Sequence, residues 1–163
     1  YMDLGSAIVG IIFLLLCVLP FILMSRSRKK REKILMQSLS KIATDNNCNI
    51  SQYELFANFG IGVDIEKPAV FFYRKTGESV SEHYVDLKEF LSCKVLNVSR
   101  SLTSKSGNQK VIDKLELAFT SADKNKPQIR LEFFDANVTP QLFGELQSIQ
   151  KWAIQLSELL KKK

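Results

Sequence analysis

The sequence predicts an α+β protein, and three features of its 163 residues carry that prediction. A long uncharged run comes first, a period-two alternation of apolar and polar residues follows from about residue 53 to 136, and an amphipathic helical pattern ends the chain. The expected order is a transmembrane helix, a juxtamembrane helix, a bent antiparallel sheet of about six or seven strands, and a C-terminal helix that caps the sheet.

The uncharged run extends from Leu4 to Met24 and holds 21 residues. At about 1.5 Å per residue, this helix would match the ~30 Å hydrocarbon layer of a bilayer. A cleaved signal peptide fits less well, because the run is longer than the ~7–15 residues of such a peptide and no small-residue cleavage site follows it. We therefore expect a retained transmembrane anchor over residues 1–24. Ser6 and Gly10 form a small-x-x-x-small pair through which another helix could approach closely.

Six basic residues follow the run within nine positions, and no Lys or Arg precedes it. The positive-inside rule then places the N-terminus outside and the rest of the chain in the cytoplasm. Topology alone would produce this cluster, although basic residues at the membrane interface also attract anionic headgroups. The cluster consists of Arg26, Arg28, Lys29, Lys30, Arg31 and Lys33.

The rest of the chain is nearly neutral. The formal net charge is +6, but residues 34–163 hold 17 basic and 15 acidic side chains. The basic isoelectric point therefore does not indicate nucleic-acid binding, and no nucleic-acid partner is expected. Cys17, Cys48 and Cys93 show no C-x-x-C spacing, which fits a reducing compartment.

Residues 25–47 are predicted to form a basic juxtamembrane segment and an amphipathic helix, next to the apolar helix or continuous with it. The part from 27 to 45 contains no Gly or Pro. Leu35, Leu39 and Ile42 follow i, i+4, i+7 spacing, and we expect this stripe to dock on the domain or on a partner.

The alternation that predicts strands is clearest in KLELAF and QIRLEFF, where apolar residues face one way and charged residues the other. Turn residues between the strands leave no room for helical crossovers, so the sheet is expected to be antiparallel, with one face buried and one wet. Gly60 and Gly62 are expected to permit a bulge or a close backbone approach. Candidate strands are Leu55–Asp64, Ala69–Lys75, Glu82–Asp86, Ser92–Leu102, Lys110–Thr120 and Gln128–Asp135.

The last predicted element is a helix with Thr139 as N-cap and Pro140 at its first position. Its apolar residues recur at spacings of four and three from Leu142 to Leu160, so one broad face must cover the sheet. A bent sheet closed by a C-terminal helix that carries a single Trp, here Trp152, resembles a pleckstrin-homology domain. Residues 48–163 are expected to form this domain in the cytoplasm.

A second resemblance covers nearly the whole chain. The segments GIGVDIEKPAVFFYRK, KVIDKLELAF and FGELQSIQKWA, behind an anchor and a basic run, resemble a family of short bacterial single-pass membrane proteins without a known activity. This resemblance implies a location in the bacterial cell inner membrane. It implies no catalytic, cofactor-binding or metal-binding residues.

The residue types needed for catalysis are scarce. His83 is the single histidine and lies in a predicted strand, where a surface position is the expected interpretation. The sequence contains no G-x-S-x-G, Walker A or H-E-x-x-H motif, and Cys48 and Cys93 lack neighbours that would activate a thiolate. We therefore expect no enzyme activity and no cofactor.

Two functions remain as hypotheses. In the first, the chain is an accessory or scaffold subunit of a larger membrane complex, with integral membrane proteins and the lipid bilayer as partners. In the alternative, the domain is a membrane-surface sensor that binds an anionic lipid headgroup or a peptide. The candidate residues for a headgroup are Lys94, Arg100, Lys105 and Lys110.

Overall fold

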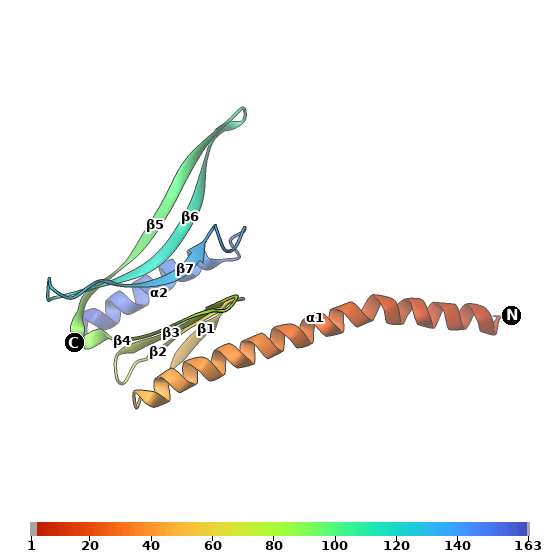
Figure 1. Cartoon of the computed structure of the whole chain (residues 1–163), viewed down its shortest axis with the longest axis horizontal. Coiled ribbons are helices and arrows are strands. Elements are labelled where there is room, and N and C mark those ends of the chain that lie inside the picture. Colours follow the sequence, from red (N-terminus) through yellow and green to blue (C-terminus); the bar gives the residue numbers. More distant parts are fainter. Residues whose placement is uncertain (1–2, 163) are drawn as a thin grey trace.

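The computed structural model describes residues 3–162 and consists of a long helix, two antiparallel sheets and a second helix (Figure 1). The expected α+β class, the apolar N-terminal helix and the C-terminal helix are confirmed. In chain order the elements are α1 (Leu4–Asp45), β1 (Gln52–Leu55), β2 (Phe59–Asp64), β3 (Ala69–Thr76), β4 (Ser79–Asp86), the 3-10 turn η1 (Leu87–Glu89), β5 (Phe90–Ser104), β6 (Gly107–Ser121), β7 (Ile129–Asp135) and α2 (Glu145–Lys161).

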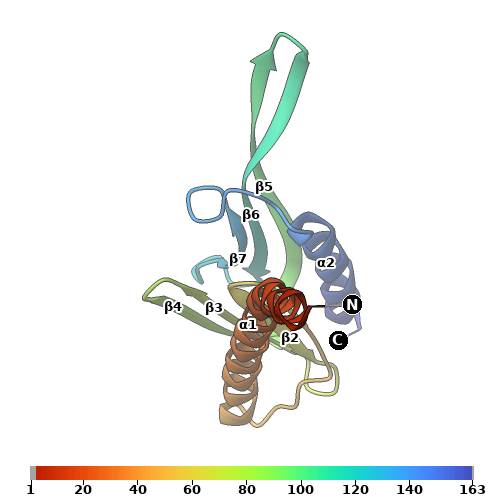
Figure 2. The ribbon, with the colours of Figure 1, turned by 90° about the vertical axis from the view of Figure 1, so that its right-hand side faces the viewer.

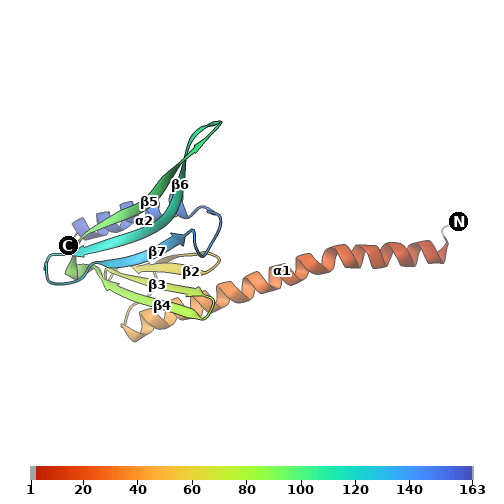
Figure 3. The same cartoon turned by 45° about the horizontal axis from the view of Figure 1, so that its top comes forward.

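Helix α1 is one continuous helix of 42 residues, so of the two arrangements left open by the sequence, the juxtamembrane helix continues the apolar one (Figure 3). It runs through Pro20, which removes one backbone hydrogen bond without ending the helix. Residues 3–31 are exposed along their whole length. Within the described part of the chain, α1 alone is long and apolar enough to cross a membrane.

The last turns of α1 pack against the outer face of the first sheet. Leu35, Leu39 and Ile42 are buried there in one apolar cluster with Phe71 and Tyr73 of β3. Because α1 covers this face of the sheet, every residue of β2 is buried. The expectation that one face of the sheet would be exposed to solvent is therefore wrong for this part of the sheet.

Gly60 makes the close packing of α1 on β2 feasible. A Cβ atom at this position would lie 2.9 Å from Leu39 Cδ1 and 2.8 Å from Leu55 Cδ2, closer than carbon atoms approach. At Gly60 the close approach to the strand backbone is therefore made by leucine side chains, one of them from the helix.

The single bent sheet expected from the sequence is instead two sheets, with strand orders β1-β2-β3-β4 and β5-β6-β7. The chain leaves the first sheet at η1, where the Asp86 carboxylate accepts a hydrogen bond from the Lys88 amide (3.1 Å) and Leu87 donates to the Pro68 carbonyl (3.0 Å). The chain passes through this turn from one sheet to the other, and β4 and β5 do not pair with each other.

The expected strand Leu55–Asp64 covers β2 and only the last residue of β1, and the unexpected β1 brings the described total to seven strands. The Phe56 amide donates to the Phe59 carbonyl (2.8 Å), and the two rings stack with centroids 4.4 Å apart. These contacts close a tight turn between β1 and β2, which alternation alone does not reveal.

The main core lies between the two sheets and α2. Phe59 and Phe72 of the first sheet face Leu117, Phe119, Leu131 and Phe133 of the second, and all of these side chains are buried. Ile149, Trp152 and Leu156 of α2 complete the cluster, as the spacing of the helix predicted.

Helix α2 begins at Glu145, so the expected start at Thr139 and Pro140 is wrong. The amides of Val138 and Thr139 both donate to the Asp135 carbonyl (3.0 and 2.9 Å), which commits these residues to a turn after β7. Gly144, with φ of 95°, then leads into the helix in the left-handed conformation that favours glycine.

Strands β5 and β6 continue far beyond the body of the domain as a two-stranded arm, defined here as residues 98–112 (Figure 2). A register shift between Val98 and Ser99 lies at its base, and Gly107 closes its tip with φ of 119°. This length was not expected from the sequence, which ended the strands at Leu102 and began the next at Lys110.

Candidate functional site

Helix α2 fills the gap between two sheet edges, β1 of the first sheet and β5 of the second. Side-chain bonds fasten it to β1: the carboxylate of Glu54 accepts from Ser148 Oγ and from Trp152 Nε1 (3.0 Å), and Gln155 donates to Gln52. On the β5 side, Ser157 Oγ donates to the Cys93 carbonyl at 3.3 Å. These bonds connect α2 to both sheet edges, and a space remains between α2 and β5.

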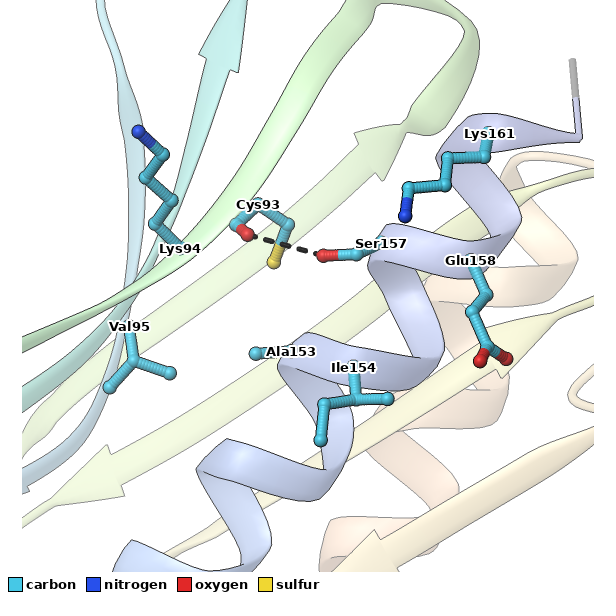
Figure 4. Close-up of a pocket in the computed structure, with 8 residues that line it drawn as sticks. All are labelled: Cys93, Lys94, Val95, Ala153, Ile154, Ser157, Glu158 and Lys161. Atoms are coloured by element: carbon cyan, nitrogen blue, oxygen red, sulfur yellow. Dashed lines mark hydrogen bonds between the residues drawn. The ribbon is translucent and has the colours of Figure 1, made fainter.

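That space is a groove of about 540 Å³ between β5 and α2 (Figure 4). Its apolar part consists of Val95, Ala153 and Ile154, and Ile154 is 65% exposed although it belongs to a helix of the core. Charged side chains border it: Lys94, Glu158 and Lys161.

The backbone of β5 faces this groove with unused hydrogen-bonding groups. In an antiparallel strand each residue directs its N–H and C=O to the same side, and the side alternates along the chain. Because the Cys93 carbonyl bonds to α2, Val95 and Asn97 also face away from β6. Within residues 3–162 β5 pairs with β6 alone, so the groups of Val95 and Asn97 are available to another strand.

The thiol of Cys93 is a packing group and no nucleophile. It is 7% exposed and belongs to the main core, and burial raises its pKa to about 12. The groove therefore offers apolar surface, charge at its border and strand backbone, a combination suited to binding an extended chain.

We expect alkylation to confirm that Cys93 is inert. At pH 8, a pKa of about 12 leaves about 10⁻⁴ of the thiol ionised, against about a quarter for an unfolded cysteine, so iodoacetamide should react about 10³-fold more slowly in the native protein than in urea. Peptide mass spectrometry measures both rates. Equal rates would show that the thiol is accessible and ionised.

The residues proposed from the sequence for a headgroup site do not come together. Lys94 borders the groove, whereas Arg100, Lys105 and Lys110 lie on the arm. Arg100 also forms an ion pair with Asp113 (3.1 Å). The four basic side chains therefore do not form one binding site for a lipid headgroup.

The other residues singled out from the sequence lie on α1 or near it. The basic cluster is exposed, with Arg28 paired to Glu32 (3.4 Å), and Ser6 and Gly10 are exposed on the apolar part. The stripe of Leu35, Leu39 and Ile42 packs on the first sheet, as described above. His83 lies half-buried on β4 beside Phe72, and burial lowers its pKa.

Sequence reasoning gave no role to Arg74, whose guanidinium is 5% exposed between the sheets. It donates to the Glu132 carbonyl (2.7 Å), pairs with the Glu132 carboxylate (3.3 Å) and lies over the Phe59 ring. Burial lowers its pKa although Glu132 opposes this shift. These contacts join β3 to β7, which gives Arg74 a structural role.

Sequence reasoning also missed the groove. The one available signal was Ile154, an apolar residue outside the predicted helical stripe. Among the described residues, no group of three or more His, Cys, Asp or Glu side chains is placed to hold a metal ion. Comparison of the chain with models of known protein families, with curated proteins and with solved structures finds no match.

Proposed function

We propose that this chain is a non-catalytic accessory subunit of a larger membrane protein complex. In this proposal α1 is the membrane anchor, and the domain binds an extended segment of a partner protein in the groove between β5 and α2. The observation that carries the proposal is the open edge of β5 above an apolar floor. An extended segment that adds to such an edge gains backbone hydrogen bonds, while pockets beside the edge select its side chains.

Orientation and fold are part of the same proposal. The six basic residues after Met24 favour a cytoplasmic domain, and the family resemblance favours the bacterial inner membrane. Four strands followed by three, with a C-terminal helix across the gap, support the pleckstrin-homology-like interpretation.

The experiment is a mild-detergent purification of the full chain, with quantification of the membrane proteins that co-purify. Ile154→Asp places a charge on the apolar floor, and Val95→Pro removes an N–H that faces the groove while edge strands tolerate proline. We expect each variant to lower partner recovery about tenfold or more, because central interface residues commonly contribute more than about 1.4 kcal/mol.

Val80→Asp is the matched control, because Val80 is an exposed β-branched residue on β4, outside the groove. It should leave partner recovery unchanged. Equal recovery with all three variants would contradict the groove as the binding site.

A second candidate is the lipid-sensor function, and one observation favours it. A cavity of about 360 Å³ between α1 and the first sheet is lined by Arg31 and Lys75 and by no carboxylate. Recovery of the chain without any partner, together with retention on phosphatidylglycerol vesicles that depends on Arg31 and Lys75, would favour this function over the first.

A further inference from the structure

The β7–α2 loop (residues 136–144) presents an unusual side chain to solvent. Phe143 is 71% exposed, whereas the other eight Phe residues after Met24 are buried or half-buried. Single exposed apolar residues are common on protein surfaces, so the meaning of this ring depends on how the loop holds it and on what lies beside it.

The loop holds Phe143 in this position through bonds of its own. The Phe143 amide donates to the carboxylate of Glu145, which is itself buried, and Gly144 adopts the left-handed turn that follows. At the other end, Ala136 donates to the Asp113 carbonyl (2.8 Å). The ring is therefore exposed because the backbone of the loop directs it outward.

The loop lies on the side of the domain from which α1 leaves toward residue 4 (Figures 1 and 3). Phe143 and Thr139 line a cavity of about 410 Å³ together with Arg28 and Arg31 of α1 and the carboxylates of Glu32 and Glu145. These arginines follow Met24 by four and seven residues, so they lie about 6 and 10 Å beyond the apolar run. Phe143 is therefore at about the same depth.

We infer that the β7–α2 loop is a second membrane contact, in which Phe143 enters the headgroup layer of the bilayer that α1 crosses. This inference rests on the proposed membrane crossing of α1. The headgroup layer is about 5–8 Å thick on each side, and Arg28 lies about 6 Å beyond the apolar run, so the ring that shares a cavity with Arg28 is within reach of this layer. An aromatic ring beside arginines is the composition of segments that lie in the interface.

The consequence concerns the orientation of the groove. One helix alone would let the domain turn about the axis of α1, whereas a second contact restricts that rotation. One wall of the groove is formed by α2, and α2 follows the β7–α2 loop directly in the chain. A loop held at the membrane would therefore also set the direction in which the groove opens.

The test places an environment-sensitive dye on the full chain in vesicles of phosphatidylcholine and phosphatidylglycerol. Phe143→Cys in a Cys17→Ala background offers one exposed thiol, since Cys48 and Cys93 are buried. Asn125→Cys is the matched control, in an exposed loop between β6 and β7 at the opposite end of the domain. A third sample carries the dye on Cys17 itself and reports whether α1 is in the bilayer.

We expect nitroxide lipids to quench the dye at residues 17 and 143 strongly, and at residue 125 severalfold less. Quenching at 17 together with equal, weak quenching at 143 and 125 would overturn the inference and leave the membrane anchor intact. Weak quenching at all three positions would overturn the anchor and, with it, the inference.

Discussion

Replacing Leu39 by aspartate is expected to detach α1 from the first sheet and destabilise the whole domain. Leu39 is fully buried between β2 and β3, directly over Gly60. Removing a buried leucine side chain alone costs about 2–5 kcal/mol, and a carboxylate in an apolar contact adds to that cost. We therefore expect the free energy of unfolding to fall by more than about 3 kcal/mol.

Urea unfolding followed by the fluorescence of Trp152, which is buried, measures this loss in detergent solution. Gln37→Asp is the matched control on the exposed side of the same helix and should change stability by less than about 0.5 kcal/mol. An unchanged midpoint for Leu39→Asp would mean that α1 does not depend on this contact with the sheet.

Replacing Phe59 by alanine is expected to produce a comparable loss through the main core. The Phe59 ring is fully buried, with its centroid 5.0 Å from that of Phe133 and 5.5 Å from that of Phe72. It also lies under the Arg74 guanidinium, so the substitution removes contacts to both sheets. Truncation of a buried phenylalanine costs about 3–5 kcal/mol, and we expect a loss in this range.

Phe143→Ala is the control for this substitution, because the same side chain is removed from an exposed position. It should leave the urea midpoint nearly unchanged. A similar loss for both variants would show that Phe143 contributes to the fold, and that its exposure is no sign of a membrane contact.

The substitutions of Leu39 and Phe59 disrupt the packing on opposite faces of the first sheet. Strands β2 and β3 are covered by α1 on one face and by the main core on the other. A fragment that begins at residue 48 would expose Phe71 and Tyr73, so experiments on the domain need the chain from about residue 34 onward.

The docking of α1 also couples the apolar part of this helix to the domain. Because one continuous helix is packed onto the sheet, a shift of the apolar part is transmitted to β2 and β3 without a flexible linker. A separate juxtamembrane helix would uncouple the two.

Local patterns predicted much of this fold. The alternation in KLELAF places Leu115, Leu117 and Phe119 in the core, and the helical spacing of α2 places Ile149 and Leu156 there. These predictions succeed because each depends on the period of one element and on one buried face.

Features that depend on two elements could not be predicted in this way. The division into two sheets depends on which strands pair, and the groove depends on how α2 packs between β1 and β5. Neither arrangement leaves a periodic signal. The arm was also shortened in the prediction, because the residues at its tip, 103–110, include no apolar side chain.

The most direct measurement for the proposed function is amide hydrogen exchange on the full chain, alone and bound to its co-purified partner. The amides of Lys94 and Leu96 face β6 in both states, whereas the amides of Val95, which lines the groove, and of Asn97 face away from β6. Strand addition predicts slower exchange in the 93–97 segment of the complex, by about tenfold or more, with no change in β4. Equal exchange of this segment in both states would contradict binding of an extended segment at β5.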